Sequence, residues 1–458
     1  MARPLRIGLI GFGNIGSGVI QALRDNRDLL DARCPRPLEL FRVADIDLER
    51  PRPVEVDRSL LTTDAEAVLR DPEIDVVVEL VGGLEPARSF VEQALRAGKH
   101  VVTANKMVLA HHGAELLALA QEKRVRLLFE AAVGGGIPVI RVLTECLAAN
   151  RITRIAGILN GTCNYILTQM TAAGMSFDKA LADAQMHGYA EPDPTADIES
   201  IDAANKIAIL ASLAFGLDIR HDDVHREGIA ELTLEDLKAA EADGYVVKQL
   251  AVAEIEEEEQ VAVGVRPTLL WKDHPLATVG DVLNGIIIEG QPIGAIFLVG
   301  PGAGPQATAS AVLSDVIALS AFENGQSLAP PFLTMPVARK PQKRAECACD
   351  GYWLRILSDG NDQTLGDVAR ILATHHVSVE RISKEPWELQ ITPDAWQWKP
   401  VSAYNPCAIR VHTGEISERH IREAIREIDN ARWRVPESVT LALPRHESTR
   451  VPNWLSET

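Results

Sequence analysis

The chain is poor in several kinds of residue, and each shortage excludes a class of protein. Positive charge is in deficit, with 46 Lys and Arg against 64 Asp and Glu, and a net charge of -18 argues against a nucleic-acid or anionic-membrane surface. No run of about 18 apolar residues occurs, so we expect no transmembrane helix. The N-terminal residues lack a small-residue cleavage site, so we expect no signal peptide.

Cysteine is also scarce, with six scattered residues. Their spacing fits neither a zinc site nor a disulfide scaffold, which indicates reduced thiols and a cytoplasmic protein. The 458 residues, of which 46% are hydrophobic, are enough for two or three domains with real cores.

A glycine-rich turn lies between a short apolar strand, residues 5–10, and a helix. A GxGxxG motif in this position predicts a dinucleotide site, because glycine permits the tight turn and a close approach of the main chain to a pyrophosphate. The alternative is a purely structural turn. The expected cofactor-binding residues are Gly11, Phe12, Gly13, Asn14, Ile15 and Gly16.

Acidic residues end the second predicted strand, residues 39–45. A carboxylate here accepts hydrogen bonds from the adenosine ribose and repels a 2′-phosphate, so Asp45 and Asp47 favour NAD over NADP. Arg50 and Arg52 lie further along the chain and would reverse this preference if the loop folded them over a phosphate.

Strands and helices then alternate to about residue 129, which predicts a parallel, doubly wound sheet with ligands at the carboxyl ends of its strands. The sequence Thr103-Ala104-Asn105-Lys106 falls at such an end. An ammonium group there can hold a carbonyl or anionic oxygen. The alternative is a solvated lysine in a turn.

The densest group of ionisable residues lies in residues 186–206. We expect residues 188–194 to form a loop, because they include a glycine and two prolines, and Asp197 to cap the helix that follows. Asp202 and Lys206 are four apart and share one helix face. They form either an exposed salt bridge, worth little, or a buried proton-transfer pair, and their apolar neighbours favour burial.

Glu130 and a run of three glycines, residues 134–136, form the next unusual stretch. Consecutive glycines are costly in backbone entropy, so we expect a loop that other residues cannot form or a hinge between domains. Further on, residues 260–300 predict an antiparallel sheet. Residues 300–315 predict a glycine loop and a helix that returns to the first domain.

Residues 329–347 carry four prolines and a basic cluster, which predicts a linker. Two βαβ units follow within about 100 residues, as in a ferredoxin-like module. Few contacts are expected to cross such a linker, so truncation near Pro341 is predicted to leave the active site working.

From about residue 5 to residue 443 the chain resembles homoserine dehydrogenases, and its tail resembles an ACT regulatory domain. The motifs that carry the resemblance are the GxGxxG turn and residues 103–106, 130–138, 160–165 and 188–206. Three departures stand out: Cys163 replaces a Thr, Ser200 replaces a Gly, and residues 359–364 replace the acidic-Pro-Gly turn of the ACT domain.

The resemblance implies the reversible NAD(P)-dependent reduction of aspartate 4-semialdehyde to homoserine, in threonine, methionine and isoleucine biosynthesis. Lys206 would be the general acid and base, with Lys106 and Asp202 as further catalytic residues. The substrate would contact Glu191, Asp202 and Lys106. Further cofactor contacts would be Asp45, Thr103, Lys106, Gly188 and Gly302, and a monovalent cation (Na or K) would contact Glu130, Val133, Gly135 and Ile137.

The sequence therefore predicts an α/β protein with a Rossmann-type doubly wound parallel sheet, a second α+β catalytic and dimerisation domain, and a C-terminal ferredoxin-like (ACT-like) domain. The expected boundaries are 1–136 plus 301–330 for dinucleotide binding, 137–300 for catalysis, 331–349 for the linker, 350–445 for the ACT-like domain and 446–458 for a tail. The resemblance also implies a homodimer or homotetramer and an amino-acid effector at the ACT-like domain.

Two other functions remain open at this point. One is a phosphorylating semialdehyde dehydrogenase that uses Cys163 as its nucleophile, although no histidine is evident to activate the thiol. The other is a non-catalytic, NAD-binding amino-acid sensor built on the ACT-like module.

Overall fold

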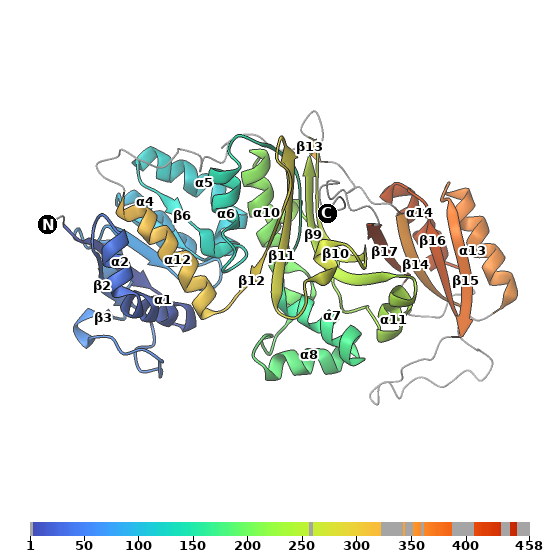
Figure 1. Cartoon of the computed structure of the whole chain (residues 1–458), viewed down its shortest axis with the longest axis horizontal. Coiled ribbons are helices and arrows are strands. Elements are labelled where there is room, and N and C mark those ends of the chain that lie inside the picture. The colour runs from blue at the N-terminus through green and yellow to red at the C-terminus, as the bar shows by residue number, and fades with distance from the viewer. Residues whose placement is uncertain are drawn as a thin grey trace.

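The computed structural model describes residues 3–255, 260–321, 342–343, 351–358, 361–386, 407–431 and 440–446. Three regions follow one another along the long axis in Figure 1: the N-terminal domain, a central layer of long strands, and the C-terminal module. The predicted linker lies outside the described residues, except for β13 (Gln342–Lys343). No helix in the described part of the chain is long and apolar enough to cross a membrane.

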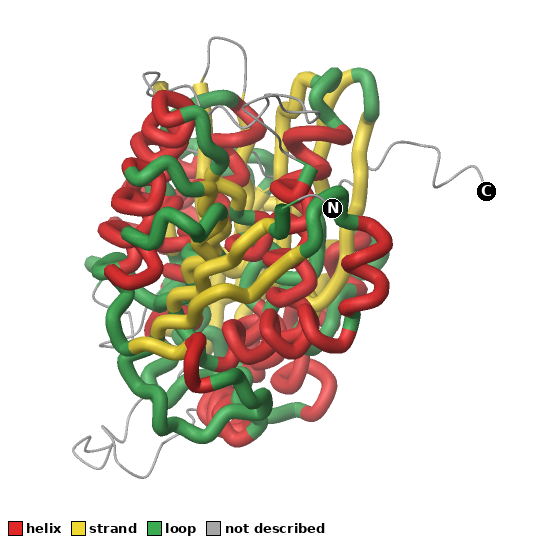
Figure 2. The backbone as a smooth tube through the Cα atoms, turned by 90° about the vertical axis from the view of Figure 1, so that its left-hand side faces the viewer, coloured by secondary structure: helices red, strands yellow, loops and turns green. Residues whose placement is uncertain are grey.

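The N-terminal domain is built on a six-stranded parallel sheet of order β3-β2-β1-β4-β5-β6, the doubly wound order that the sequence predicts. Its strands are β1 (Leu5–Ile10), β2 (Leu38–Ala44), β3 (Leu61–Thr62), β4 (Val76–Glu79), β5 (His100–Thr103) and β6 (Leu127–Leu128). Its helices are α1 (Asn14–Asp25), α2 (Arg27–Arg33), α3 (Glu66–Leu69), α4 (Ala87–Arg96) and α5 (Lys106–Lys123). Figure 2 shows this sheet nearest the viewer, with helices on both sides of it.

A late segment of the chain completes this domain. Helix α12 (Pro305–Ser320) buries Ala309, Val312 and Val316 against the core beneath α1. The helices approach so closely that a Cβ at Gly18 would lie 2.8 Å from the Pro305 carbonyl oxygen. The predicted return of the chain to the first domain is therefore present (Figure 1).

The second sheet has the order β12-β11-β7-β9-β10-β17-β14-β16-β15 along its main path. The strands of the central region are β7 (Arg151–Ile158), β8 (His225–Arg226), β9 (Tyr245–Ile255), β10 (Gln260–Trp271), β11 (Leu283–Gln291) and β12 (Gly294–Pro301). Neighbours among β12, β11, β7, β9 and β10 run antiparallel, as predicted for residues 260–300. The helices of this region are α6 (Val139–Arg141), α7 (Gly161–Ala173), α8 (Phe177–Met186), α9 (Thr195–Ile198), α10 (Ile201–Phe215) and α11 (Leu234–Ala242).

The C-terminal module has the β-α-β-β-α-β order of elements that the sequence predicts. Its elements are β14 (Gly351–Ser358), α13 (Asp362–Thr374), β15 (Val379–Pro386), β16 (Cys407–Thr413), α14 (Glu418–Asp429) and β17 (Leu441–His446). Strand β17 pairs with β10, so the module extends the central sheet.

The expectation that few contacts join the module to the rest of the chain is wrong. Arg355 of β14 forms a buried ion pair with Asp236 of α11, at 2.8 Å. Arg266 of β10 forms another with Glu418 of α14, at 3.0 Å. Trp353 is fully buried in the core that α7 and α11 share. A proline-rich sequence reveals a linker, but it does not reveal what the segments on either side bury together.

Candidate active site

The glycine turn leaves open space where a dinucleotide phosphate would approach. Gly11 has φ +101°, and a Cβ at Gly16 would lie 2.2 Å from the Gly11 oxygen, so both positions require glycine. A Cβ at Gly13, in contrast, would meet nothing within 4 Å. Gly13 precedes the first turn of α1, whose main-chain N–H groups favour an anion. The turn therefore fits the cofactor that the motif predicts.

Asp45 stabilises the glycine turn directly. Its Oδ2 accepts a hydrogen bond from the Phe12 N–H at 2.6 Å, and its Oδ1 lies 3.3 Å from an Arg52 nitrogen. Arg52 is folded back over the Phe12 ring, with its guanidinium carbon 4.5 Å from the ring centroid. The guanidinium also donates to the main-chain oxygens of Phe12, Asp47, Leu48 and Arg50.

A buried polar network at the ends of β4 and β5 positions Lys106. Thr103 donates to Glu79 at 2.6 Å and accepts from the Asn105 N–H, so its hydroxyl holds the turn together. Asn105 caps α5 at Val108 and donates to Val81 and Gly83. Sequence reasoning missed Glu79, whose signal is a lone carboxylate in an otherwise apolar strand. Burial raises its pKa to about 7.

The two predicted lysines meet on one carboxylate. Lys106 Nζ lies 2.9 Å from Asp202 Oδ1, and Lys206 Nζ donates to Asp202 Oδ2 at 2.6 Å. Lys106 comes from the N-terminal domain and the other two from α10, so the cluster spans the two domains. Asp202 and Lys206 are both buried, which excludes the exposed salt-bridge alternative, whereas the Lys106 side chain is 41% exposed.

The electrostatics of the cluster favour an ionised Asp202. Burial alone would raise the pKa of Asp202, but Lys206 and Lys106 outweigh it and hold that pKa well below its usual range. Asp202 in turn raises the pKa of Lys106. The carboxylate therefore stays ionised, within ion-pair distance of both lysines.

Neighbouring groups complete the cluster. Lys206 also donates to the Leu159 carbonyl at 2.8 Å, and Asn160 donates to Asp202 at 3.0 Å and to Asp197 at 2.7 Å. Glu191 lies in the exposed loop, where its charge contributes to raising the pKa of Lys106. Loop residues 188–194 are confirmed as non-helical.

The expected N-cap role of Asp197 is wrong. Asp197 lies within the short helix α9, and Ser200 precedes α10 with a φ of 64°. The helical spacing of apolar residues could not reveal this break, because it depends on contacts with a distant segment. Gly188, a predicted cofactor contact, lies just beyond the end of α8 with φ +74° and is exposed.

Glu130 lies at the start of the glycine loop and is buried. Its carboxylate accepts from the Ile140 and Arg141 N–H groups at 2.8 and 3.0 Å. Burial and the nearby Asp315 raise its pKa to about 7. Gly135 packs so closely on Gly302 that a Cβ at Gly135 would lie 2.6 Å from the Gly302 main chain. The loop is therefore both an ordered turn and a junction between the two domains.

Cys163 does not have the environment of a nucleophile. It is fully buried in α7, and its thiol donates to the Asp197 carbonyl at 3.2 Å. Burial raises its pKa well above the usual value, which suppresses the thiolate.

Comparison with known proteins agrees with the fold and identifies the family. Residues 11–130 match the homoserine dehydrogenase NAD-binding domain, and residues 138–317 match the homoserine dehydrogenase family. A homoserine dehydrogenase of Synechocystis is 49% identical over 68% of this chain and 72% of its own length. The crystal structure of a homoserine dehydrogenase from Thiobacillus denitrificans superposes with a TM-score of 0.85 at 36% identity, covering 97% of this chain and 99% of that one.

A hyperthermophilic archaeal homoserine dehydrogenase in complex with NADPH is 26% identical, with a TM-score of 0.59, and covers 70% of this chain and all of that one. Neither the phosphorylating dehydrogenase nor the non-catalytic sensor is supported by these relatives. The chain belongs to the homoserine dehydrogenase family, the NAD(P)-dependent oxidoreductases that its motifs predicted.

Proposed function

We propose that Lys206 is the general acid and base of the homoserine dehydrogenase reaction, the reversible reduction of L-aspartate 4-semialdehyde to L-homoserine. The observation that carries the assignment is the sharing of Asp202 by two ammonium groups from different domains. Two of the three Lys206 protons go to Asp202 and Leu159, which leaves one for the substrate oxygen. The reduced cofactor, NAD(P)H, would supply the hydride for reduction, and the oxidised cofactor would accept it in the reverse reaction.

Lys106 is the more exposed of the two lysines and is proposed to polarise the same oxygen. Asp202 keeps both ammonium groups in place and, with Glu191, binds the ammonium group of the substrate. The discriminating experiment is steady-state oxidation of homoserine by Lys106→Met and Lys206→Met. Loss of polarisation should raise KM and lower kcat in the first, whereas loss of the proton donor should act mainly on kcat in the second.

NAD is proposed as the preferred cofactor. Asp45 lies beside the glycine turn, and Arg52 has its donors engaged by main-chain oxygens and by Asp45. A 2′-phosphate near Asp45 should cost on the order of 1–3 kcal/mol, or about one to two decades of affinity. The kcat/KM values with NAD and NADP test this, with Arg50→Ala as the matched variant. Clear NADP preference that Arg50→Ala abolishes would show that Arg50 binds the phosphate.

A monovalent cation, Na or K, is proposed at the glycine loop. The donor set is Glu130 with the main-chain carbonyls of Val133, Gly135 and Ile137, which is the oxygen chemistry that hard cations prefer. The cation would brace the junction between the domains. Activity should fall when Na and K are replaced by tetramethylammonium at constant ionic strength, and Glu130→Gln should weaken the dependence on cation concentration. An equal rate in all three salts would refute the site.

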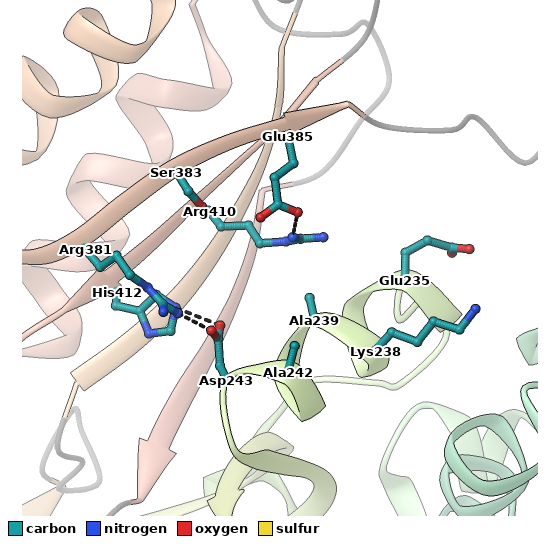
Figure 3. Close-up of a pocket in the computed structure, with 10 residues that line it drawn as sticks. All are labelled: Glu235, Lys238, Ala239, Ala242, Asp243, Arg381, Ser383, Glu385, Arg410 and His412. Atoms are coloured by element: carbon teal, nitrogen blue, oxygen red, sulfur yellow. Dashed lines mark hydrogen bonds and ion pairs between the residues drawn. The ribbon is translucent and has the colours of Figure 1, made fainter.

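The C-terminal module is proposed to be an ACT-like regulatory domain that binds an amino acid. Support comes from a cavity of about 480 Å³ between α11 and the exposed face of β15 and β16, lined by both acidic and basic side chains (Figure 3). Arg410 and Lys238 suit a carboxylate, and Glu235 suits an ammonium group. Isothermal titration with the end-product amino acids, repeated on Lys238→Ala, tests the assignment. Unchanged binding by the variant would exclude this cavity.

The assembly is proposed to be a homodimer or homotetramer in the cytoplasm. Edge strand β12 exposes Phe297 and Val299, which are 39% and 47% accessible, and an apolar edge of this kind is suited to pairing with a second copy. Light scattering should show a dimer or larger that Phe297→Glu weakens. A monomeric wild-type protein would contradict the proposal.

A further inference from the structure

Ser200 occupies a backbone conformation that is costly for a serine. It has a φ of 64°, is fully buried, and directly precedes the catalytic helix α10. A non-glycine residue in the left-handed region is strained and persists only where surrounding contacts hold it there. Its hydroxyl donates to the Glu227 carbonyl at 2.7 Å and accepts from Gln249 at 2.9 Å. These bonds explain why the conformation is held.

Residues 225–229, here called the coupling segment, contact the α9–α10 junction through their main chain. Besides the Ser200 bond, the Ile229 N–H donates to the Ile198 carbonyl at 2.9 Å. A Cβ at Gly228 would lie 2.7 Å from the same oxygen, so this close approach requires glycine. Two hydrogen bonds therefore fix the α9–α10 junction, two residues before Asp202.

The side chains of the coupling segment contact the C-terminal module instead. Arg422 of α14 donates to Glu227 at 2.8 Å and to His225 at 2.7 Å. Arg422 also pairs with Glu418, whose other oxygen accepts from Arg266 at 3.0 Å. One short segment thus joins the module to the helix that carries Asp202 and Lys206.

We infer that Ser200, Glu227 and Arg422 are positioning residues for the homoserine dehydrogenase reaction: the coupling segment sets the first turn of α10, and α14 holds the coupling segment. Misplacement of Asp202 relative to Lys106 lowers the rate, because small errors in the placement of reacting groups are costly in catalysis. The module is in this way part of the geometry of the active site, although none of its described residues contacts the lysine cluster.

The test is a double-mutant cycle on homoserine oxidation with Ser200→Gly and Arg422→Met. Ser200→Gly removes both hydroxyl bonds but relieves the backbone strain, so a purely structural role predicts unchanged turnover. We expect kcat/KM for homoserine to fall about tenfold in Ser200→Gly and about threefold in Arg422→Met, with KM for NAD unchanged. Because both act through Glu227, the double variant should lose less than the product of the two. Arg426→Met, on the same helix and exposed, is the matched control.

A second readout does not depend on activity. Hydrogen exchange of a peptide spanning residues 197–206 should be faster in Ser200→Gly and Arg422→Met than in Arg426→Met. Homoserine turnover by the wild-type protein tests the assigned reaction, whereas the variants test whether the coupling segment positions α10. The two claims can therefore fail independently. Wild-type kcat/KM in Ser200→Gly, multiplicative losses in the double variant, or unchanged exchange would each overturn the inference.

Discussion

Two buried carboxylates, Asp202 and Asp236, form ion pairs of similar length but with opposite consequences. Asp236 is paired with Arg355 and accepts from the Thr233 N–H and hydroxyl, all within the interface between α11 and the C-terminal module. Asp202 is shared by two lysines, and the side chain of one of them, Lys106, is 41% exposed. One carboxylate neutralises one cation, whereas the other keeps two cations close together.

The difference shows how a catalytic ion pair can be told from a structural one. Asp236 and Arg355 are both buried within the interface, so neither charge can reach a substrate, and the contribution of the pair is to specificity of packing. In the Asp202 cluster the Lys106 side chain is partly exposed, so its ammonium group is accessible to a substrate oxygen. Distance alone would not separate the two cases.

The largest expected effect is on the rate of Asp202→Asn. Removal of the charge leaves two adjacent ammonium groups that repel each other, so Lys106 and Lys206 lose their common position. We expect kcat/KM for homoserine to fall by about 100-fold or more. If steady-state kinetics show that kcat/KM falls only a few-fold, Asp202 is a structural ion-pair residue like Asp236.

Asp236→Asn should lower the stability of the protein and leave its turnover nearly unchanged. It removes the carboxylate charge with which Arg355 pairs at 2.8 Å, which costs roughly 3 kcal/mol of unfolding free energy, while kcat stays within a few-fold of wild type. Urea denaturation and turnover of the folded protein measure the two effects.

Truncation near Pro341, for the same reason, is expected to give a poorly soluble protein. A stable, fully active truncated chain would contradict the role given to the module.

Glu79 should make stability depend on pH. Its folded pKa is raised from 4.5 to about 7, so the folded protein keeps a proton that the unfolded chain has lost between these values. Stability should therefore fall as the pH rises through this window, by on the order of 1–3 kcal/mol, and Glu79→Gln should flatten the decline. Denaturation at pH 5 and pH 8 tests this, with exposed Glu122→Gln as a control. Equal slopes in wild type and Glu79→Gln would show that Glu79 does not titrate in this range.

The smallest expected effect is that of Cys163→Ser. The serine hydroxyl can keep the hydrogen bond to the Asp197 carbonyl, and the buried thiol has no part in the chemistry. Homoserine turnover should stay within about threefold of wild type. Complete loss of activity would reopen a covalent role for this residue.

Much of this arrangement could be predicted from the sequence because it depends on local patterns. The glycine turn, the alternation of strands and helices, and the i,i+4 spacing of Asp202 and Lys206 are such patterns. The meeting of Lys106 with Asp202 is different, since nothing in the spacing brings residues 96 positions apart together; there the family resemblance supplied the prediction.

Other features could not be predicted, because they arise from contacts between distant segments. Ser200 adopts a left-handed conformation through its bonds to Glu227 and Gln249, so the helix break after Asp197 has no local signal. The buried pairs of Arg355 and Arg266 likewise join segments more than a hundred residues apart. Each is visible only once the chain has folded.

The most direct test of the central claim is the turnover number of Lys206→Met measured beside that of Lys248→Met. Both lysines are buried, but Lys248 donates to Asn164 and to the Val279 carbonyl, whereas Lys206 donates to Asp202. If Lys206 transfers the proton, its variant should lose about 100-fold or more in kcat while the folded Lys248 variant keeps most of its activity. A Lys206→Met enzyme with turnover within a few-fold of wild type would contradict the assignment.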